Sequence, residues 1–434
     1  MILVFVPRVT NRLKYTFNLI LGSLSGLEYR FTSKPDEFLA FEGPKFVYDK
    51  QGINGSLYFA AADLLFQRGI SITETQCYDK DGFQGLFPVF AKDSALPFDP
   101  FASAFYMVSR YEEYLPYRKD MYGRFTAHES LAYKKGFLHK AVVNRWAMLV
   151  AAILRQHFEL LTIKKPSYKF VPTVDVDSAW SYRHKGFWRT LGGYTRSLSK
   201  GDFADIITRV RVIYGLDRDP FDSFASLHAL HEKYDLKPLF FILFADYGQY
   251  DKNVPVLNPG FINLVKSIAD YADVGIHPSY ASNSSFTKLK TETQRLSDVL
   301  KREIRCSRQH FLKLELPVTY RNLINLDIMN DYTMGYAAEI GFRAGICTPF
   351  PFYDLDLDAE TPLMVHPFTV MDGTLKDYLK IPESRIPEYL EPLIREVKET
   401  GGTFISLWHN ETHGGQGRWA GWPELYRTIV EMAV

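Results

Sequence analysis

The chain has 434 residues, of which 46% are hydrophobic and 23% charged, a composition typical of a globular protein with two or three domains. Its 51 Lys and Arg nearly balance its 50 Asp and Glu, so the bulk charge of +1 gives no reason to expect a nucleic acid or an anionic membrane as partner. The three cysteines (Cys77, Cys306 and Cys347) form no CxxC pair, which argues against a zinc ribbon and favours reduced thiols in the cytoplasm.

The first residues, MILVFVP, predict a strand rather than the start of a signal peptide. In a signal peptide the positive charges precede the apolar core, whereas here Arg8, Arg12 and Lys14 follow it. No run of about 18 apolar residues predicts a transmembrane helix. We therefore expect a protein of the cytoplasm.

Two helices dominate the expected structure of the next 150 residues. One begins at Asp99, a good N-cap, with Pro100 in the first helical position. The other is the long apolar segment 141–161, and the polar stretch 162–169 after it predicts a boundary. We expect an N-terminal α/β domain of unknown role over residues 1–165 and a second domain over 170–434.

The N-terminal part has no glycine motif for a nucleotide and no obvious catalytic cluster. Its most suggestive charges are predicted to form a solvated surface or an inter-domain salt-bridge surface. These residues are Arg110, Glu112, Glu113, Asp120 and Arg124. The N-terminal domain as a whole could also cover the mouth of the barrel and narrow the choice of substrate.

From residue 170 onward, strand patterns alternate with helix patterns. The strands are expected at 169–176, 238–245, 273–278, 304–311, 342–347 and 402–409, and the helices at 222–235, 259–271, 286–303 and 384–399. Strands separated by helices pair in parallel through right-handed crossovers. This pattern predicts an α/β fold, and more narrowly a distorted or incomplete (β/α) barrel.

The predicted strand ends carry the residues capable of chemistry. Asp175 and Asp177 end the first strand, and because residues i and i+2 face the same side, the two carboxylates project together. Their mutual repulsion is relieved if a proton or a cation lies between them. Histidine and arginine end three other strands, as His277, as Arg308 with His310, and as His409. A divalent metal held by Asp and His, with the second Asp free as a base, accounts for this set.

Four motifs, TVDVD, HPSY, SRQHF and LWHN, resemble in that order the motifs of the polysaccharide deacetylases, the NodB-homology or carbohydrate esterase 4-like family. The resemblance covers residues 170–410. Two further segments, FDPFASAFYMVSRYEEY and GRFTAHESLAYKKGFL, resemble a bacterial subgroup with an extra N-terminal α/β domain. The resemblance implies a barrel of the glycoside hydrolase/deacetylase type.

The resemblance also implies roles for individual residues. Asp175 matches the catalytic base, Asp177 a metal ligand and His277 the first metal histidine. Arg308 matches the arginine that holds the base, and His409 matches the general acid. The implied cofactor is a divalent metal, with Zn first and Co, Ni or Mn as alternatives.

One position departs from the family pattern, because Ala281 stands where a second metal histidine is expected. His310, on the next strand end, is our candidate for the missing ligand. Ser279, Ser282 or water are alternatives, as is a domain that binds no metal.

Further residues near the predicted site loops are candidates for substrate contacts, with plain packing or a turn as the alternative for each. These are Trp180, Tyr280, Trp408 and Asp331. Asp372 also lies near an element end, without an assigned role. His228 and His231 lie on a predicted helix among charged residues, where we expect them to be solvated.

Together these features predict a metal-dependent hydrolase that removes an N- or O-linked acetyl group from a sugar in a glycan or glycan precursor. One alternative is a catalytically weakened, glycan-binding relative of the deacetylases. Another is a glycosyltransferase that uses its DVD segment to hold Mn²⁺, although this leaves His277, Arg308 and His409 without roles. The oligomeric state stays open.

Overall fold

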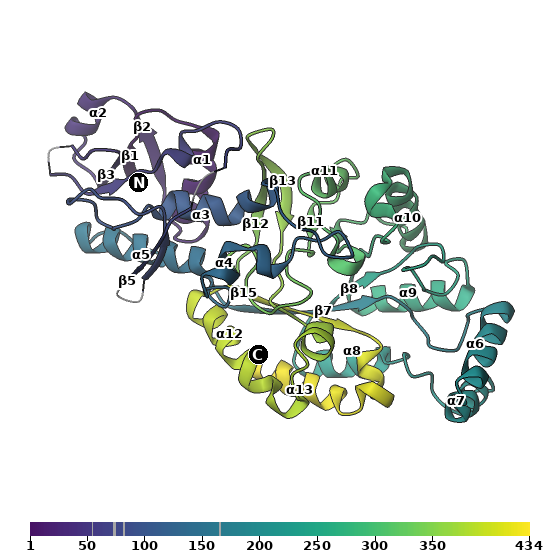
Figure 1. The fold of residues 1–434 in the computed structure, drawn as a ribbon. Helices are drawn as coiled ribbons and strands as arrows, with labels where there is room; N and C mark the ends of the chain where they lie inside the picture. Colours follow the sequence, from purple (N-terminus) through teal and green to yellow (C-terminus); the bar gives the residue numbers. More distant parts are fainter. Residues whose placement is uncertain (54, 73–74, 81–82, 165) are drawn as a thin grey trace.

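Two separate sheets organise the chain, a small one near the N-terminus and a large one in the rest of the molecule (Figure 1). The computed structural model describes residues 1–53, 55–72, 75–80, 83–164 and 166–434. The small sheet has four parallel strands in the order β2-β1-β3-β4: β1 (Ile2–Phe5), β2 (Tyr29–Thr32), β3 (Lys45–Asp49) and β4 (Tyr58–Ala60). A short antiparallel pair follows, β5 (Cys77–Lys80) and β6 (Phe83–Leu86).

The helices beside the small sheet include both of those predicted for this part. They are α1 (Asn11–Phe17), α2 (Pro35–Ala40), α3 (Pro100–Val108), α4 (Leu131–Lys134) and α5 (Val142–His157). The carboxylate of Asp99 accepts the backbone N–H groups of Phe101 and Ala102, as expected of an N-cap. The strand predicted at the start of the chain is confirmed as β1.

The large sheet has nine strands in the order β12-β13-β11-β10-β9-β8-β7-β15-β14. They are β7 (Lys169–Val176), β8 (Leu239–Ile242), β9 (Asp273–Ile276), β10 (Cys306–Ser307), β11 (Asn330–Asp331), β12 (Phe350–Asp354), β13 (Ala359–Val365), β14 (Val370–Met371) and β15 (Thr403–His409). All neighbours pair in parallel except β12 with β13. The predicted parallel α/β arrangement is therefore confirmed.

The predicted helices of this part are confirmed as α8 (Phe224–Lys233), α9 (Pro259–Tyr271), α10 (Phe286–Leu300) and α12 (Ile386–Thr400). Four further helices were not predicted: α6 (Phe187–Ser199), α7 (Phe203–Ile213), α11 (Val318–Ile324) and α13 (Trp422–Ala433). In the described part of the chain, no helix has both the length and the apolar character to cross a membrane.

The strand predicted at 342–347 is wrong. Gly345 adopts a positive φ of 64°, and its N–H bonds the carbonyl of Phe342, so the chain turns there instead of extending. Among the described residues, the edge strands β12 and β14 pair with one neighbour each, so the sheet is open and not a closed barrel. Whether its curvature is that of an incomplete barrel stays a prediction.

The two parts of the chain share one apolar core, since buried side chains on both sides of residue 165 belong to a single cluster. Buried ion pairs also cross between the parts. Glu113 binds Arg110 at 2.7 Å and, from the second part, Arg343 at 2.6 Å. Of the charges predicted around Arg110, Arg110 and Glu113 thus form buried salt bridges, whereas Asp120, which pairs with Arg124 at 2.7 Å, is half-buried. The domain boundary itself stays a prediction.

Candidate active site

The carboxyl ends of four strands meet at one pocket of the large sheet. β7 leads into Asp177, β9 into His277, β10 into Arg308 and His310, and β15 ends at His409. These strands lie close together in the sheet and run in parallel, so their carboxyl ends open on the same edge. The pocket there has a volume of about 180 Å³. Its lining residues are Arg124, Asp175, Asp177, His277, Gln309, His310, Phe311, Leu312, Ala337, Met371, Gly373, Asp377, Tyr378, Leu407 and His409.

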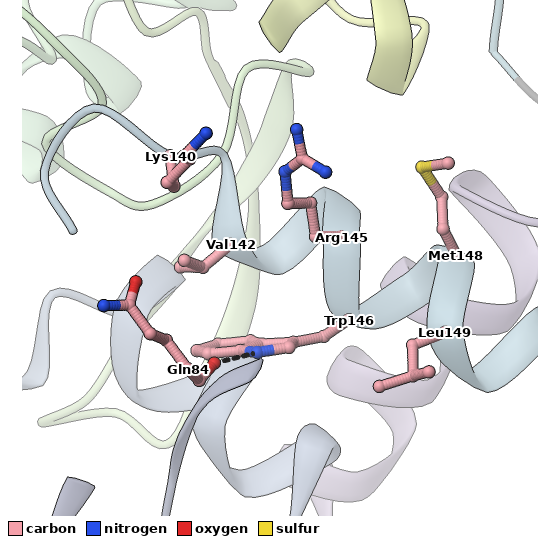
Figure 2. Close-up of a pocket in the computed structure, with 7 residues that line it drawn as sticks. All are labelled: Gln84, Lys140, Val142, Arg145, Trp146, Met148 and Leu149. Atoms are coloured by element: carbon pink, nitrogen blue, oxygen red, sulfur yellow. Dashed lines mark hydrogen bonds between the residues drawn. The ribbon is translucent and has the colours of Figure 1, made fainter. Parts of the chain in front are cut away.

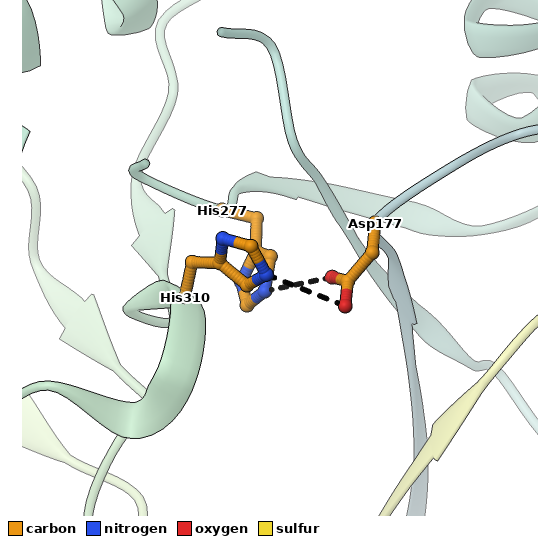
Figure 3. Close-up of side chains that lie close together, drawn as sticks. All are labelled: Asp177, His277 and His310. Atoms are coloured by element: carbon orange, nitrogen blue, oxygen red, sulfur yellow. Dashed lines mark ion pairs between the residues drawn. The ribbon is translucent and has the colours of Figure 1, made fainter. Parts of the chain in front are cut away.

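Asp177, His277 and His310 point toward one another in this pocket (Figure 3). Nε2 of His277 lies 3.2 Å from Oδ1 of Asp177, and Nε2 of His310 lies 3.4 Å from Oδ2. The three potential ligand atoms lie within 4.8 Å of one another. Within the described residues this is the one such group of three or more His, Cys, Asp or Glu side chains.

Both histidine rings are oriented by a hydrogen bond on the far side. Nδ1 of His277 lies 2.6 Å from the backbone carbonyl of Arg308, which can only accept, so Nδ1 carries the proton. Nδ1 of His310 lies 2.8 Å from a carboxylate oxygen of Asp251 and donates to it in the same way. With Nδ1 engaged in this way, Nε2 is the nitrogen that each ring turns toward the pocket and offers to a metal, as metal-ligating histidines do.

Asp251 is a residue that sequence analysis missed. It lies in the loop after β8, is buried, and accepts the backbone N–H groups of Tyr280 and Ala281 at 2.8 and 3.4 Å. No motif surrounds it in the sequence, so its role appears only once the loop folds against His310. The backbone of Ala281, the position that lacks the expected histidine, thus helps to fix the carboxylate that orients His310.

Charge shapes the titration of His310 and Asp177. Burial lowers the pKa of His310, but the carboxylates of Asp177 and Asp251 outweigh burial and raise this pKa to about 9. Burial raises the pKa of Asp177, yet His310, His277 and His409 together hold it well below its usual value.

The group fits a divalent metal ion. Oδ1 of Asp177 is buried and has no hydrogen-bond partner among the described residues, although a buried carboxylate oxygen normally has one. Two imidazole nitrogens and one carboxylate are a donor set typical of zinc and of similar transition metals.

Asp175 lies beside this group and is held by Arg308. Nη1 of Arg308 donates to Oδ1 of Asp175 and to the hydroxyl of Thr173, both at 2.8 Å. Nε of the same guanidinium donates to the carbonyl of Tyr332 at 3.0 Å. The fully buried guanidinium also lies 4.5 Å from the ring centre of Phe241. The carboxylate is therefore fixed, with its other oxygen 3.7 Å from Nε2 of His277.

His409 faces the pocket from β15 and is held by Asp372. The backbone N–H and Nδ1 of His409 both donate to the Asp372 carboxylate at 2.8 Å, which leaves Nε2 at 3.8 Å from Oδ2 of Asp177. Burial lowers the pKa of His409, but Asp372, Asp177 and Asp175 raise it well above its usual value. The raised pKa favours the form of His409 that carries a proton on Nε2.

The residues predicted to contact substrate do not line the pocket. Trp408 and Asp331 are fully buried, and the Trp408 ring packs on Trp422 and Tyr426. Trp180 is also buried, against His184. Tyr280 is half-buried behind Phe311. None of the four is in the lining of this pocket, and a role for any of them in substrate binding stays a prediction.

The N-terminal part contributes Arg124 to the pocket. Its guanidinium pairs with Asp120 at 2.7 Å and donates to the carbonyl of Phe311 at 3.0 Å and to the hydroxyl of Tyr378 at 3.2 Å. The neighbouring Tyr122 packs its ring 5.0 Å from that of Phe311. The loop around Arg124 therefore borders the pocket that the strand ends form.

A larger cavity, of about 320 Å³, lies on α5 and lacks this chemistry (Figure 2). Its lining residues are Gln84, Lys140, Val142, Arg145, Trp146, Met148 and Leu149. Trp146 donates its indole N–H to the backbone carbonyl of Gln84, and Arg145 is paired with Glu396 and Glu399. Its lining has no carboxylate, histidine or cysteine, so it lacks the groups that make the strand-end pocket a candidate active site.

Comparison with known proteins gives a family match for the N-terminal part only. Residues 2–159 match DUF7033, a family of unknown function. No curated protein shows significant similarity to the chain.

Several solved structures resemble the chain remotely. A protein from Mycobacterium smegmatis assigned to the polysaccharide deacetylases is 14% identical, with a TM-score of 0.38 over 61% of this chain and 84% of that one. A pseudoenzyme of carbohydrate esterase family 4 from Bacillus anthracis is 10% identical, with a TM-score of 0.31 over 61% and 60%. An allantoinase is 11% identical, with a TM-score of 0.38 over 62% and 83%. Similarities this remote do not determine the function of the chain.

Proposed function

We propose that this protein is a metal-dependent hydrolase that removes an acetyl group from a sugar in a glycan or glycan precursor. The observation that carries the proposal is the arrangement of the pocket. Three metal-type ligands converge there, with a fixed carboxylate close to one of them and the imidazole of His409 close to another.

Asp177, His277 and His310 would hold the metal, most readily Zn²⁺, with Co²⁺, Ni²⁺ or Mn²⁺ as alternatives. A bound divalent cation supplies Lewis acidity, which polarises an acyl carbonyl and lowers the pKa of water. In this reading His310 takes the place of the histidine that Ala281 lacks, and Asp251 keeps the Nε2 lone pair of His310 turned toward the site.

Asp175 is the proposed general base. Arg308 fixes one oxygen of this carboxylate, while the other faces the metal-type ligands and is free to accept a proton from an attacking water. Because Arg308 is itself held by Thr173 and Tyr332, the carboxylate is already oriented before substrate binds.

His409 is the proposed general acid. Its raised pKa favours the protonated ring, and the hydrogen bond of Nδ1 to Asp372 leaves Nε2 facing the pocket. A departing amine or alkoxide of a sugar would receive the proton on Nε2.

The acetyl group is supported by the sequence motifs and by the lining of the pocket. Small and medium apolar side chains stand beside the charged groups, and they suit a methyl group. They are Leu312, Ala337, Met371 and Leu407. The sugar would extend toward Tyr378, Asp377 and Arg124, which supply the polar part of the lining.

The two alternatives fit the site less well. A weakened glycan-binding relative is suggested by Ala281, yet the imidazole of His310, from another strand end, lies close enough to Asp177 and His277 to share a metal with them. A glycosyltransferase would use the DVD segment to hold a metal-bound diphosphate, but Asp175 is engaged by Arg308, and this alternative leaves His277 and His409 without roles.

The test is acetate release from acetylated monosaccharides, chitooligosaccharides and lipid- or nucleotide-linked acetylated sugars, after loading with Zn²⁺, Co²⁺ or no metal. Metal-dependent release is expected with at least one of them. The Asp175→Asn variant should bind metal normally and lose about 10²- to 10⁴-fold in kcat, because it retains shape but not basicity. A folded, metal-loaded protein that releases no acetate from any of these substrates would overturn the proposal.

A further inference from the structure

Helices α6 and α7 form a hairpin that projects from the edge of the molecule, on the far side from the N-terminal sheet (Figure 1). The hairpin follows directly after β7 and Asp177 in the chain. It therefore leaves the body from the same sheet edge that carries the candidate active site. The proposed function gives it no role.

Each helix of the hairpin carries an apolar stripe at a spacing that normally faces a core. Residues 187, 191, 194 and 198 lie at i, i+4, i+7 and i+11 in α6, and residues 203, 207 and 210 of α7 with its C-cap residue Tyr214 repeat this spacing. In α7 the whole stripe is exposed, with Phe203 at 63%, Ile207 at 60% and Tyr214 at 78%.

The exposure is concentrated in this hairpin. Of the 27 large apolar residues that lie exposed in the described part of the chain, ten fall between residues 187 and 216. They are Phe187, Trp188, Leu191, Leu198, Phe203, Ile207, Val210, Ile213, Tyr214 and Leu216. Exposed apolar residues gathered in this way mark a surface that binds a partner or a membrane.

The base of the hairpin is clamped, so the exposure does not reflect a poorly attached segment. The buried carboxylate of Asp219 accepts the backbone N–H groups of residues 181, 182 and 183 at 2.7 to 3.0 Å, which joins the two ends of the hairpin. Arg189 of α6 donates to the backbone carbonyls of Lys252 and Asn253 and lies 4.3 Å from the ring centre of Tyr247. The hairpin is thus anchored to the loop after β8.

The hairpin is also strongly basic, although the whole chain is nearly neutral. Residues 183–218 hold eight Lys and Arg against three Asp, a net charge of +5, so the rest of the chain has a net charge of −4. Basic side chains of the hairpin and of the anchoring loop line a cavity of about 520 Å³. They are Lys185, Arg189, Arg196, Lys200, Arg209 and Lys252, and Asp202 and Asp205 are the acids in the same lining.

The cations in this cavity exceed the carboxylates available to them. Only Arg209 of the six is ion-paired among the described residues, with Asp205 at 3.2 Å. Burial, followed by the charge of Arg189, lowers the pKa of Lys185 to about 8. An anion in the cavity would offset this crowding of positive charge.

We propose that the α6–α7 hairpin docks on the surface of a membrane that contains anionic phospholipids. The aromatic and aliphatic stripes enter the boundary between headgroups and acyl chains, and the basic cavity receives a lipid phosphate. Exposed Phe, Trp, Leu and Ile side chains combined with Lys and Arg are the pattern of helices that lie in the membrane interface. The charge of the hairpin favours a membrane over a second copy of this chain as its partner. Two hairpins that face each other, each with a net charge of +5, would repel.

The test is sedimentation of the full chain with vesicles of phosphatidylcholine alone or with about 30% phosphatidylglycerol. We expect binding to the anionic vesicles, at least about tenfold weaker binding to the neutral ones, and weakening at high NaCl. The Phe203→Glu/Ile207→Glu variant should lose binding to both. The Arg196→Glu/Lys200→Glu variant should lose the preference for anionic vesicles.

A matched control is Phe90→Glu/Leu357→Glu, which places the same charges at exposed apolar positions far from the hairpin in sequence. This variant should bind vesicles as the unmodified chain does. Equal loss in the control would overturn the proposal, as would absence of binding to anionic vesicles. A dimer in sedimentation equilibrium that the Phe203→Glu/Ile207→Glu variant dissolves would assign the surface to a second copy. Displacement from vesicles by millimolar inorganic phosphate at constant ionic strength would assign the cavity to free phosphate.

Discussion

Buried and half-buried histidines gather in two regions of this molecule, and their surroundings differ. In the pocket at the sheet edge, His277, His310 and His409 stand among carboxylates. Beneath the last strand, His231 of α8 and His413 pack against Tyr426 of α13. His231 makes a 2.8 Å hydrogen bond to the Tyr426 hydroxyl, and neither ring of this second region makes an ion pair with a carboxylate of the described residues.

The difference shows in the pKa values. Burial lowers the pKa of His231 to about 4 and that of His413 to about 3, so both rings are neutral and serve packing. In the pocket, burial acts in the same direction, but carboxylates outweigh it and raise the pKa of His310 to about 9. Burial alone therefore does not distinguish a functional histidine from a structural one, whereas the carboxylates around it do.

The largest effect expected from this contrast comes from exchanging one histidine in each region for glutamine. His310→Gln removes a proposed ligand, so the affinity for Zn²⁺ should fall by more than about 100-fold. This exceeds the loss of about 10- to 100-fold expected when a residue that only supports a ligand is replaced. Activity should fall together with the affinity. His413→Gln should leave zinc affinity and kcat unchanged and lower only the stability. Metal analysis after dialysis and isothermal calorimetry measure both variants.

Equal zinc affinities in His310→Gln and the unmodified chain would show that His310 does not replace the missing ligand at Ala281. In that case the ligand shell would have to be completed by Ser279, Ser282 or water. Both seryl side chains are already engaged, because Ser279 donates to Glu292 and Ser282 to the carbonyl of Ser279.

The pH dependence of zinc binding tests the same contrast without a mutation. Nε2 of His310 must lose its proton before it can donate its lone pair, and its pKa of about 9 lies above neutral pH. Zinc affinity should therefore fall as pH falls, by about tenfold per unit and about 100-fold between pH 8 and pH 6. Competition with a chelator of known protonation constants measures it, and an affinity constant over this range would contradict the assignment.

The sequence predicted those parts of the site that lie at the end of a regular strand or directly after it. Asp175, Asp177, His277 and His409 were placed together because parallel strands present their ends at one edge, and period-two spacing fixes which side chains share a face. Arg308 and His310 also meet at the site. There, however, β10 has only two residues, and the chain turns through a positive φ of 60° at Phe311.

The parts that the sequence did not predict depend on loops. Asp251 reaches His310 from an irregular segment, and Arg124 reaches the pocket from the N-terminal part, so no local pattern marks either of them. His231 was expected to be solvated because charged residues flank it, yet α8 turns it toward α13 and buries it. Helices α6 and α7 carry clear apolar spacing, but spacing alone does not say whether a stripe is covered.

A smaller effect is expected from Asp251→Asn. The amide oxygen can still accept from Nδ1 of His310, but without the negative charge the imidazole becomes a weaker ligand, and zinc affinity should fall by about 10- to 100-fold. The pH dependence should also shift to lower pH, because Asp251 contributes to the raised pKa of His310.

Asp372→Asn is the matched control, since Asp372 binds His409 and none of the proposed ligands. It should lower kcat with zinc affinity retained, and a loss of zinc in both variants alike would contradict separate roles for the two carboxylates.

The smallest effect on activity is expected in the second histidine region. Tyr426→Phe removes the partner of Nε2 of His231, whose Nδ1 already lacks a partner among the described residues. An unsatisfied buried group costs about 1 to 3 kcal/mol in the free energy of unfolding, which urea denaturation measures, while kcat should not change. Replacing both partners, as in His231→Phe/Tyr426→Phe, removes the unsatisfied group and should recover part of this loss. If the double variant loses more free energy of unfolding than the two single variants lose together, a role limited to the hydrogen bond between His231 and Tyr426 would be contradicted.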